Sequence, residues 1–148
     1  MRTFLETNGD ITLTVIRVVL GTVMFAHGAQ KLLGWFGGYG FKGTMGYLTG
    51  QVGLPSVVAL LVIGIEFFGG LALVGGLGVR VVTVGVVAVM IGAVITAHLP
   101  NGFFMNWGGS QKGEGYEYHL IVLAASAALI LRGGGKWSLD TLLVENFL

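Results

Sequence analysis

The sequence contains no cysteine, only two prolines and few charged residues. Charged residues make up 10% of its 148 positions, whereas a soluble domain has about a quarter. The absence of cysteine excludes disulfide bonds, dithiol redox chemistry and thiolate metal sites. The net charge of +1 is too small to indicate nucleic-acid binding. Because 54% of the residues are hydrophobic and the mean hydropathy is +0.85, we expect a membrane protein whose first partner is the lipid bilayer.

Four apolar runs are long enough to cross a bilayer, which takes about 20 helical residues. They cover residues 11–33, 55–77, 80–99 and 117–132, and the last is the shortest. Because their connections are short, we predict an all-α, polytopic membrane protein in which four transmembrane helices form one bundle and one domain over residues 1–148. Ser138 is a candidate N-cap before an amphipathic stretch, which predicts a short C-terminal helix at the membrane surface.

The positions of lysine and arginine predict how the bundle is oriented, because these residues favour the cytoplasmic side. With a cytoplasmic N-terminus, this side carries Arg2, Arg80, Arg132 and Lys136, against Lys42 and Lys112 on the other. We therefore predict that both termini are cytoplasmic. The two longer loops, at about 34–54 and 100–116, are then both expected on the outer face.

Glu66 interrupts the apolar run "VALLVIGIEFFGGLALVGG" (58–76). An ionised side chain in the bilayer core costs at least a few kcal/mol, so such groups face the bundle interior. Arg17 lies on a small, polar face of the first run together with His27 and Lys31, about one helical turn in depth from Glu66. Two interpretations stay open: a structural Arg17–Glu66 pair that fixes helix register, or a carboxylate that accepts protons or contacts a ligand in a cavity.

More imidazole and carboxylate groups are predicted near the outer ends of the helices. They are His27, His98, Glu114, Glu117 and His119, with Lys31 beside them. Such groups relay protons near neutral pH or bind metals. Glu117 and His119 are two residues apart and so point about 160° away from each other on a helix. We therefore favour a polar pocket open to the outer face, and expect no metal site.

Three segments carry a family resemblance: "RVVLGTVMFAHGAQKLLGWFGG", "IEFFGGLALVGGLGVR" and "GYEYHLIVLAASAALILRGGGKWSLD". Together they resemble the DoxX family of small bacterial four-helix membrane proteins, over nearly the whole chain. The resemblance implies a bacterial inner-membrane protein. It also implies a relationship to the membrane subunit of thiosulfate:quinone oxidoreductase and to membrane partners of oxidative-stress enzymes. The functional positions that it implies are Arg17, His27, Lys31, Glu66 and Glu117.

These observations lead to a first functional hypothesis and two alternatives. The first is a quinone-linked membrane subunit, with Glu66 and His27 transferring protons and with a ligand held by Arg17, Lys31, His98, Glu117 and His119. The chain has no evident flavin motif or cysteine-ligated cluster, so electrons would come from a redox protein partner. The first alternative is a non-catalytic scaffold for oxidative-stress enzymes. The second is a small transporter that acts as a homo-oligomer. Whether the chain is itself an enzyme stays open.

Overall fold

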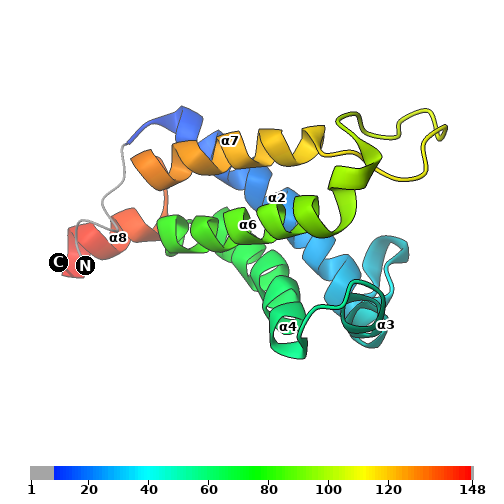
Figure 1. The fold of residues 1–148 in the computed structure, drawn as a ribbon. Coiled ribbons are helices and arrows are strands. Elements are labelled where there is room, and N and C mark those ends of the chain that lie inside the picture. Colours follow the sequence, from blue (N-terminus) through cyan, green and yellow to red (C-terminus); the bar gives the residue numbers. More distant parts are fainter. Residues whose placement is uncertain (1–8, 148) are drawn as a thin grey trace.

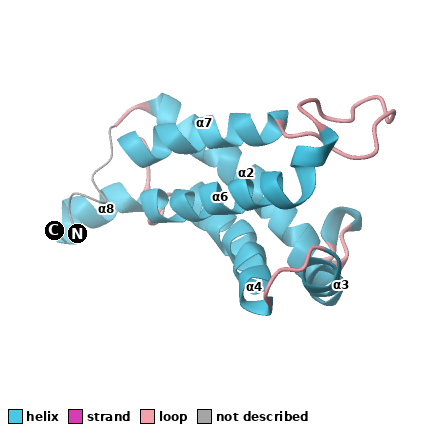
Figure 2. Ribbon diagram, in the orientation of Figure 1, coloured by secondary structure: helices cyan, strands magenta, loops and turns pink. Residues whose placement is uncertain are grey.

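The computed structural model describes residues 9–147, and within this range the chain is helical with no strand (Figure 2). The all-α prediction is therefore confirmed. The α-helices, in chain order (Figure 1), are α2 (Ile11–Leu33), α3 (Gly40–Gly46), α4 (Ser56–Gly64), α5 (Gly70–Gly75), α6 (Val79–Ala93), α7 (Glu117–Arg132) and α8 (Leu139–Phe147).

Three helical stretches are long and apolar enough to cross a membrane: Ile11–Leu33, Ser56–Gly75 and Val79–Asn101. The second joins α4 to α5 through a π-helical turn, η3 (Ile65–Gly69). The third extends α6 through a π-helical turn, η4 (Val94–His98), and a 3-10 turn, η5 (Leu99–Asn101). Helix α7 occupies the predicted range but has 16 residues, fewer than the about 20 that spanning requires. The fourth span therefore remains a prediction.

The two longer loops lie at the same end of the molecule. Figure 1 shows α3 and the loop between η5 and α7 at one end, and α8 at the opposite end. We refer to these as the loop end and the α8 end. The shared position of the two loops agrees with the sequence prediction, which depended on antiparallel helices of similar length.

Helix α2 packs against α5 and η3 at backbone contact distance. A Cβ atom on Gly28 would overlap the backbone of Glu66 and Phe67, and one on Gly21 would lie 2.8 Å from the Gly70 carbonyl oxygen. Small residues allow this close approach between membrane helices. The contact fixes the register of the two helices, because it places Glu66 level with Gly28.

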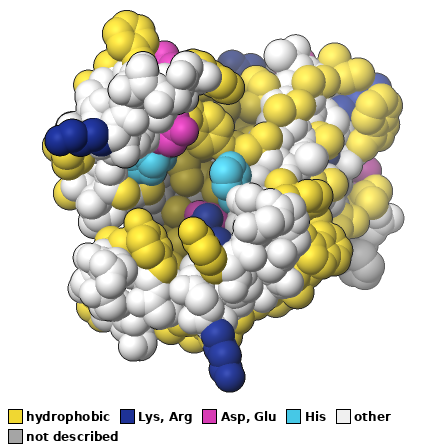
Figure 3. Space-filling view, turned by 90° about the vertical axis from the view of Figure 1, so that its right-hand side faces the viewer, with side chains coloured by type: hydrophobic (Ala, Val, Ile, Leu, Met, Phe, Trp, Pro, Cys, Tyr) yellow, Lys and Arg dark blue, Asp and Glu magenta, His cyan; other side chains and the backbone are white. Residues whose placement is uncertain are grey.

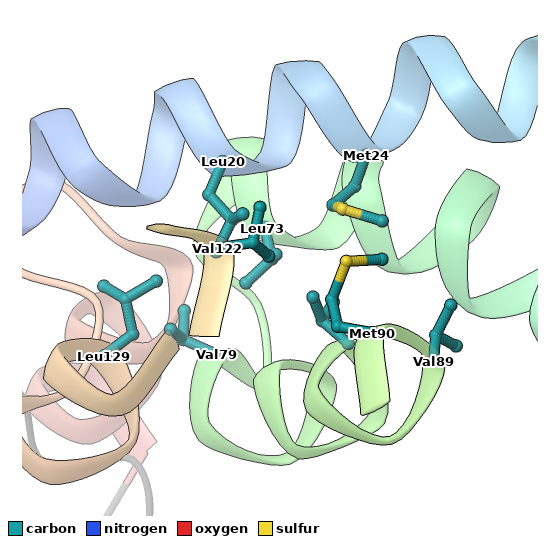
Figure 4. Close-up of a cluster of buried hydrophobic side chains, with 9 residues drawn as sticks. Leu20, Met24, Leu73, Val79, Val89, Met90, Val122 and Leu129 are labelled. Atoms are coloured by element: carbon teal, nitrogen blue, oxygen red, sulfur yellow. The ribbon is translucent and has the colours of Figure 1, made fainter. Parts of the chain in front are cut away.

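A cluster of buried apolar side chains joins α2, α5, α6 and α7. Its members are Leu20, Met24, Leu73, Val79, Val86, Val89, Met90, Val122 and Leu129, and Figure 4 shows Met24 of α2 and Met90 of α6 pointing toward each other. The outward faces are also apolar: Val57 of α4, Val81 of α6 and Ile121 of α7 are each 70% exposed. Apolar residues both inside and outside are typical of a helix bundle solvated by lipid.

The C-terminal segment closes the α8 end. Ser138 Oγ accepts a hydrogen bond from the Thr141 N–H at 3.1 Å, which confirms Ser138 as the cap of α8. The Asp140 carboxylate accepts the N–H groups of Gly78 at 2.7 Å and of Val79 at 3.0 Å. These donors begin α6, so a carboxylate from α8 satisfies the helix N-terminus and complements its dipole.

Arg17 belongs to this closure, and the predicted Arg17–Glu66 pair is wrong. Its side chain is 2% exposed, and its guanidinium donates to carbonyl oxygens of Leu73 (2.8 Å), Val74 (2.6 Å), Gly134 (2.8 Å) and Trp137 (3.4 Å). Two of these oxygens lie in the last turn of α5, where carbonyl groups run out of helical N–H partners, although the Leu73 oxygen also accepts the Gly76 N–H at 3.1 Å. The prediction estimated the depth of each residue by counting from the ends of its helix. The glycine contact instead places Glu66 level with Gly28, so Arg17 lies closer to the α8 end than Glu66 does.

Candidate functional site

A cavity of about 710 Å³ lies between α2, α4, α6 and α7. Figure 3, viewed from the loop end, shows a hollow with histidine and acidic side chains near its rim and basic and acidic side chains in its depth. Most of the wall is apolar, with Val58, Leu61, Ala88 and Ala93 among its residues. A concave apolar site of this size with a few convergent polar groups is typical of a small-molecule binding site.

Three π-helical turns each place residues in the wall of this cavity. The turn η2 (Tyr47–Gln51) contributes Tyr47, η3 contributes Glu66, and η4 contributes His98. A π turn adds a residue to the helical repeat, so it changes which side chains face inward, and such turns are frequent at functional sites. Glu66, the charged residue in the apolar run, therefore lies in an irregular turn of its helix, at the cavity wall.

Glu66 is paired with Lys31 in the depth of the cavity. Lys31 Nζ lies 2.5 Å from Glu66 Oε2, and the two side chains are 27% and 6% exposed. His27, one turn before Lys31 on α2, lines the same cavity. The ion pair is possible because Gly28 lets α2 approach η3 at the level of Glu66.

The other polar wall is built by residues that begin α7 and end the third span. The imidazole rings of His98 and His119 lie 4.2 Å apart between centroids, and His98 Nδ1 is 2.9 Å from the Glu114 carbonyl oxygen. The Tyr118 ring lies 6.3 Å from the His27 ring. Among the residues that the structure describes, the buried Tyr118 Oη has no hydrogen-bond partner, and the buried His119 Nδ1 makes no hydrogen bond of good geometry.

Five of the seven residues predicted for the site line this cavity: His27, Lys31, Glu66, His98 and His119. Arg17 lies at the α8 end, as described above. Glu117 is not part of the lining; its carboxylate accepts the Met105 N–H at 2.8 Å and so holds the loop before α7. The predicted divergence of Glu117 and His119 on the helix explains why only one of them faces the cavity.

Tyr118 and Asn101 also line the cavity, and neither was predicted as a site residue from the sequence. Tyr118 lies between Glu117 and His119, which were predicted, and its position in the first turn of a predicted helix was the available signal. Asn101 donates its side-chain N–H to the Glu114 carbonyl oxygen at 3.2 Å. It therefore helps to fix the rim.

The arrangement supplies hydrogen-bond donors and proton carriers beside an apolar space. Lysine, tyrosine and imidazole groups can donate to a carbonyl or phenolic oxygen, and imidazole and carboxylate groups can exchange protons. Within residues 9–147, no group of three or more histidine, cysteine, aspartate or glutamate side chains is placed to hold a metal ion. The geometry therefore suits an organic ligand with a polar head and an apolar body.

Comparisons of the sequence with known proteins identify its family. The DoxX family profile matches residues 12–99. A Bacillus subtilis (strain 168) protein named "Putative oxidoreductase CatD" is 32% identical over 131 residues, which is 88% of this chain and 86% of that protein. No solved structure matches the chain. By the extent of both sequence matches, this membrane protein belongs to the DoxX family.

Proposed function

We propose that the protein is a redox-associated membrane subunit that binds a quinone-like, amphipathic molecule in the cavity at the loop end. The observation that carries the proposal is the convergence of Lys31, Glu66, His27, Tyr118 and His119 on one apolar cavity of about 710 Å³. A quinone needs donors for its carbonyl oxygens, proton carriers for its reduction, and an apolar space for its tail. The cavity offers all three.

The roles of the residues follow from their positions. Tyr118 and His119 bind the headgroup because their buried polar atoms have no protein partner of good geometry in the described chain. Glu66 and His27 exchange protons with the bound headgroup, and the Lys31 ammonium, which is paired with Glu66, donates a hydrogen bond to a headgroup oxygen. His98 extends this set of groups to the rim, where it meets the Glu114 carbonyl oxygen.

The electrons come from a protein partner in this proposal. The chain has no cysteine, so it lacks the ligands of a cysteine-bound iron–sulfur cluster. The name of the Bacillus subtilis relative contains the word oxidoreductase, which favours redox chemistry over transport. A partner that docks at the loop end would reach the mouth of the cavity.

The proposed location is the bacterial inner membrane, with four spans and both termini cytoplasmic. Arg80 and Arg132 lie at the α8 end of α6 and α7, and Lys136 follows in the same region. Positive residues favour the cytoplasmic side. Arg2 was part of the same prediction and lies outside the described residues. The cavity would then open away from the cytoplasm.

The first experiment is a visible absorption spectrum and mass spectrometry of the organic extract from protein purified in a mild detergent. We expect about one quinone per chain in the extract. A matched pair of variants tests the location. Ala93→Phe adds a ring to the cavity wall, whereas Ala127→Phe adds the same ring to an exposed position of α7. The first should lose the quinone and the second should retain it.

An extract that holds only bulk lipid, combined with no binding of an added short-chain quinone, would contradict the proposal. The scaffold function would then be favoured, and co-purifying proteins would become the object of study. Quinone retained equally in both phenylalanine variants would place the site elsewhere on the molecule.

A further inference from the structure

The charges in the cavity narrow the class of molecule that it can hold. Resting on the proposed function, we infer that the cavity selects a neutral, oxygen-bearing headgroup and rejects anionic headgroups, including carboxylates and sulfur oxyanions. Ionisable groups face the cavity from each surrounding element. They are His27 and Lys31 of α2, Tyr47 of η2, Glu66 of η3, His98 of η4, and Glu114, Tyr118 and His119 of the loop and α7.

The single lysine in this set is already neutralised. Its ammonium lies 2.5 Å from Glu66 Oε2, and the glutamate is the more buried partner. With histidine counted as neutral, as in the formal charge of the chain, the remaining formal charge is the Glu114 carboxylate at the rim. An anion that enters the cavity would therefore lose its hydration without gaining a free cation, and it would pass the uncompensated Glu114 carboxylate at the rim.

A neutral headgroup meets the opposite situation. The Tyr118 hydroxyl group can donate to a carbonyl oxygen, and His119 Nδ1 is buried without a well-formed hydrogen bond in the described chain. Unpartnered buried polar atoms are unfavourable, so a ligand that pairs with them gains more than one that meets satisfied groups. Both atoms suit a quinone, a quinol or another phenol-like headgroup.

The inference has a direct consequence for the chemistry implied by the family resemblance. Thiosulfate is a doubly charged oxyanion, and the cavity offers it no unpaired cation. Sulfur oxyanions would then have to be handled by a partner protein or at another surface, while this cavity holds the neutral electron acceptor.

The test is a binding competition on the full chain in an uncharged detergent, followed by native mass spectrometry near pH 8. The probes are an alkyl-1,4-naphthoquinone and the fatty acid that carries an alkyl chain of the same length. They share a tail and differ in headgroup charge. For the wild type we expect at least about tenfold preference for the naphthoquinone, because like charges in a site of low effective dielectric repel strongly.

Replacing Glu66 should shift this preference in a defined direction. In Glu66→Gln the Lys31 ammonium loses its counter-ion, so we expect binding of the fatty acid to rise and the preference to fall at least about tenfold. Glu145→Gln is the matched control, because it removes the same charge from an exposed position on α8. It should leave the ratio at the wild-type value.

A second variant keeps the test decisive if Glu66→Gln does not fold. Glu114→Gln removes the rim charge and should shift the ratio in the same direction by a smaller factor, because the Glu114 side chain is exposed to solvent and its charge is screened. A wild type that binds the fatty acid as well as the naphthoquinone would overturn the inference but leave a ligand-binding cavity. Failure to bind either probe would overturn the proposed function as well.

Discussion

Buried polar side chains have different hydrogen-bond partners at the two ends of the bundle. At the α8 end, Arg17 donates to four backbone carbonyl oxygens and Asp140 accepts two backbone N–H groups. At the loop end, Tyr118 Oη is buried without a partner in the described chain, beside an open cavity. The difference indicates that buried polarity closes the structure where its partners are backbone atoms. Where those partners are missing, the proposed function assigns the buried polar groups to a ligand.

The largest expected effect breaks the closure of the α8 end. Arg17→Met removes the guanidinium donor from the carbonyl oxygens of Leu73, Val74 and Gly134, of which the Leu73 oxygen keeps the Gly76 N–H at 3.1 Å, so the free energy of unfolding should fall by at least about 3 kcal/mol. Thermal unfolding in mild detergent measures it. Arg17→Lys is the control: its ammonium group keeps the charge but can donate to fewer of the carbonyl oxygens than the guanidinium does. The loss of stability should therefore be intermediate. Wild-type stability in Arg17→Met would show that the closure is dispensable.

The second prediction concerns the glycine contact that separates the two ends. Gly28→Ala adds a Cβ that would overlap the backbone of Phe67, so α2 must move away from η3. We expect a loss of about 1–3 kcal/mol in stability, and weaker naphthoquinone binding because the Lys31–Glu66 pair is spread apart. Gly64→Ala is the control, because an added Cβ there meets nothing within 4 Å. It should lower neither the stability nor the affinity for the naphthoquinone. Equal behaviour of the two variants would contradict the close packing.

The third prediction sharpens the contrast at the loop end. Tyr118→Phe removes a hydroxyl group that has no partner within the described residues, so thermal stability should be unchanged. Affinity for the naphthoquinone should fall roughly three- to tenfold, the value of one hydrogen bond. Tyr116→Phe is the control, because Tyr116 lies two residues before Tyr118 and is not part of the cavity lining. This variant should bind the naphthoquinone as the wild type does. A loss of stability without a loss of affinity would assign Tyr118 to the closure instead.

The smallest effect is expected at the start of α2. The Thr12 N–H donates to Asp10 Oδ1 at 2.8 Å, and this hydrogen bond lowers the pKa of the Asp10 carboxyl group below its ordinary value of 3.8. The folded state therefore gains stability from this cap above the ordinary pKa, and loses it as pH falls through the lower folded value. Asp10→Ala should remove this acid-dependent component from the unfolding midpoint, whereas Asp10→Asn should keep the cap and lose the pH dependence.

Much of the fold could be predicted from apolar length and turn chemistry. The bounds of α2 and α7 match the predicted runs, and the Ser138 cap follows from residue type. Antiparallel helices also place His98 and His119 at one end, and the structure brings their rings to 4.2 Å. These features depend on local sequence and on helix length, which are visible in one chain.

The partners of the buried charges could not be predicted in the same way. Arg17 binds backbone carbonyl oxygens, which leave no signal in residue types. Glu66 pairs with Lys31 because of helix register, and the register depends on where Gly28 meets η3. The π turns also change the inward face without a change in composition. A regular helical repeat therefore does not predict which side chains of these turns face the cavity.

The shortness of α7 has a consequence for the surrounding lipid. Its 16 residues extend about 24 Å at 1.5 Å each, against about 30 Å of bilayer hydrocarbon. A spanning α7 creates a hydrophobic mismatch, which the bilayer relieves by thinning locally. Tyr118 and His119 lie in the first turn of α7, so headgroups drawn inward by this thinning would meet the rim of the cavity. If α7 spans the bilayer and the cavity has the proposed function, the acyl-chain length of the lipid would become a determinant of ligand entry.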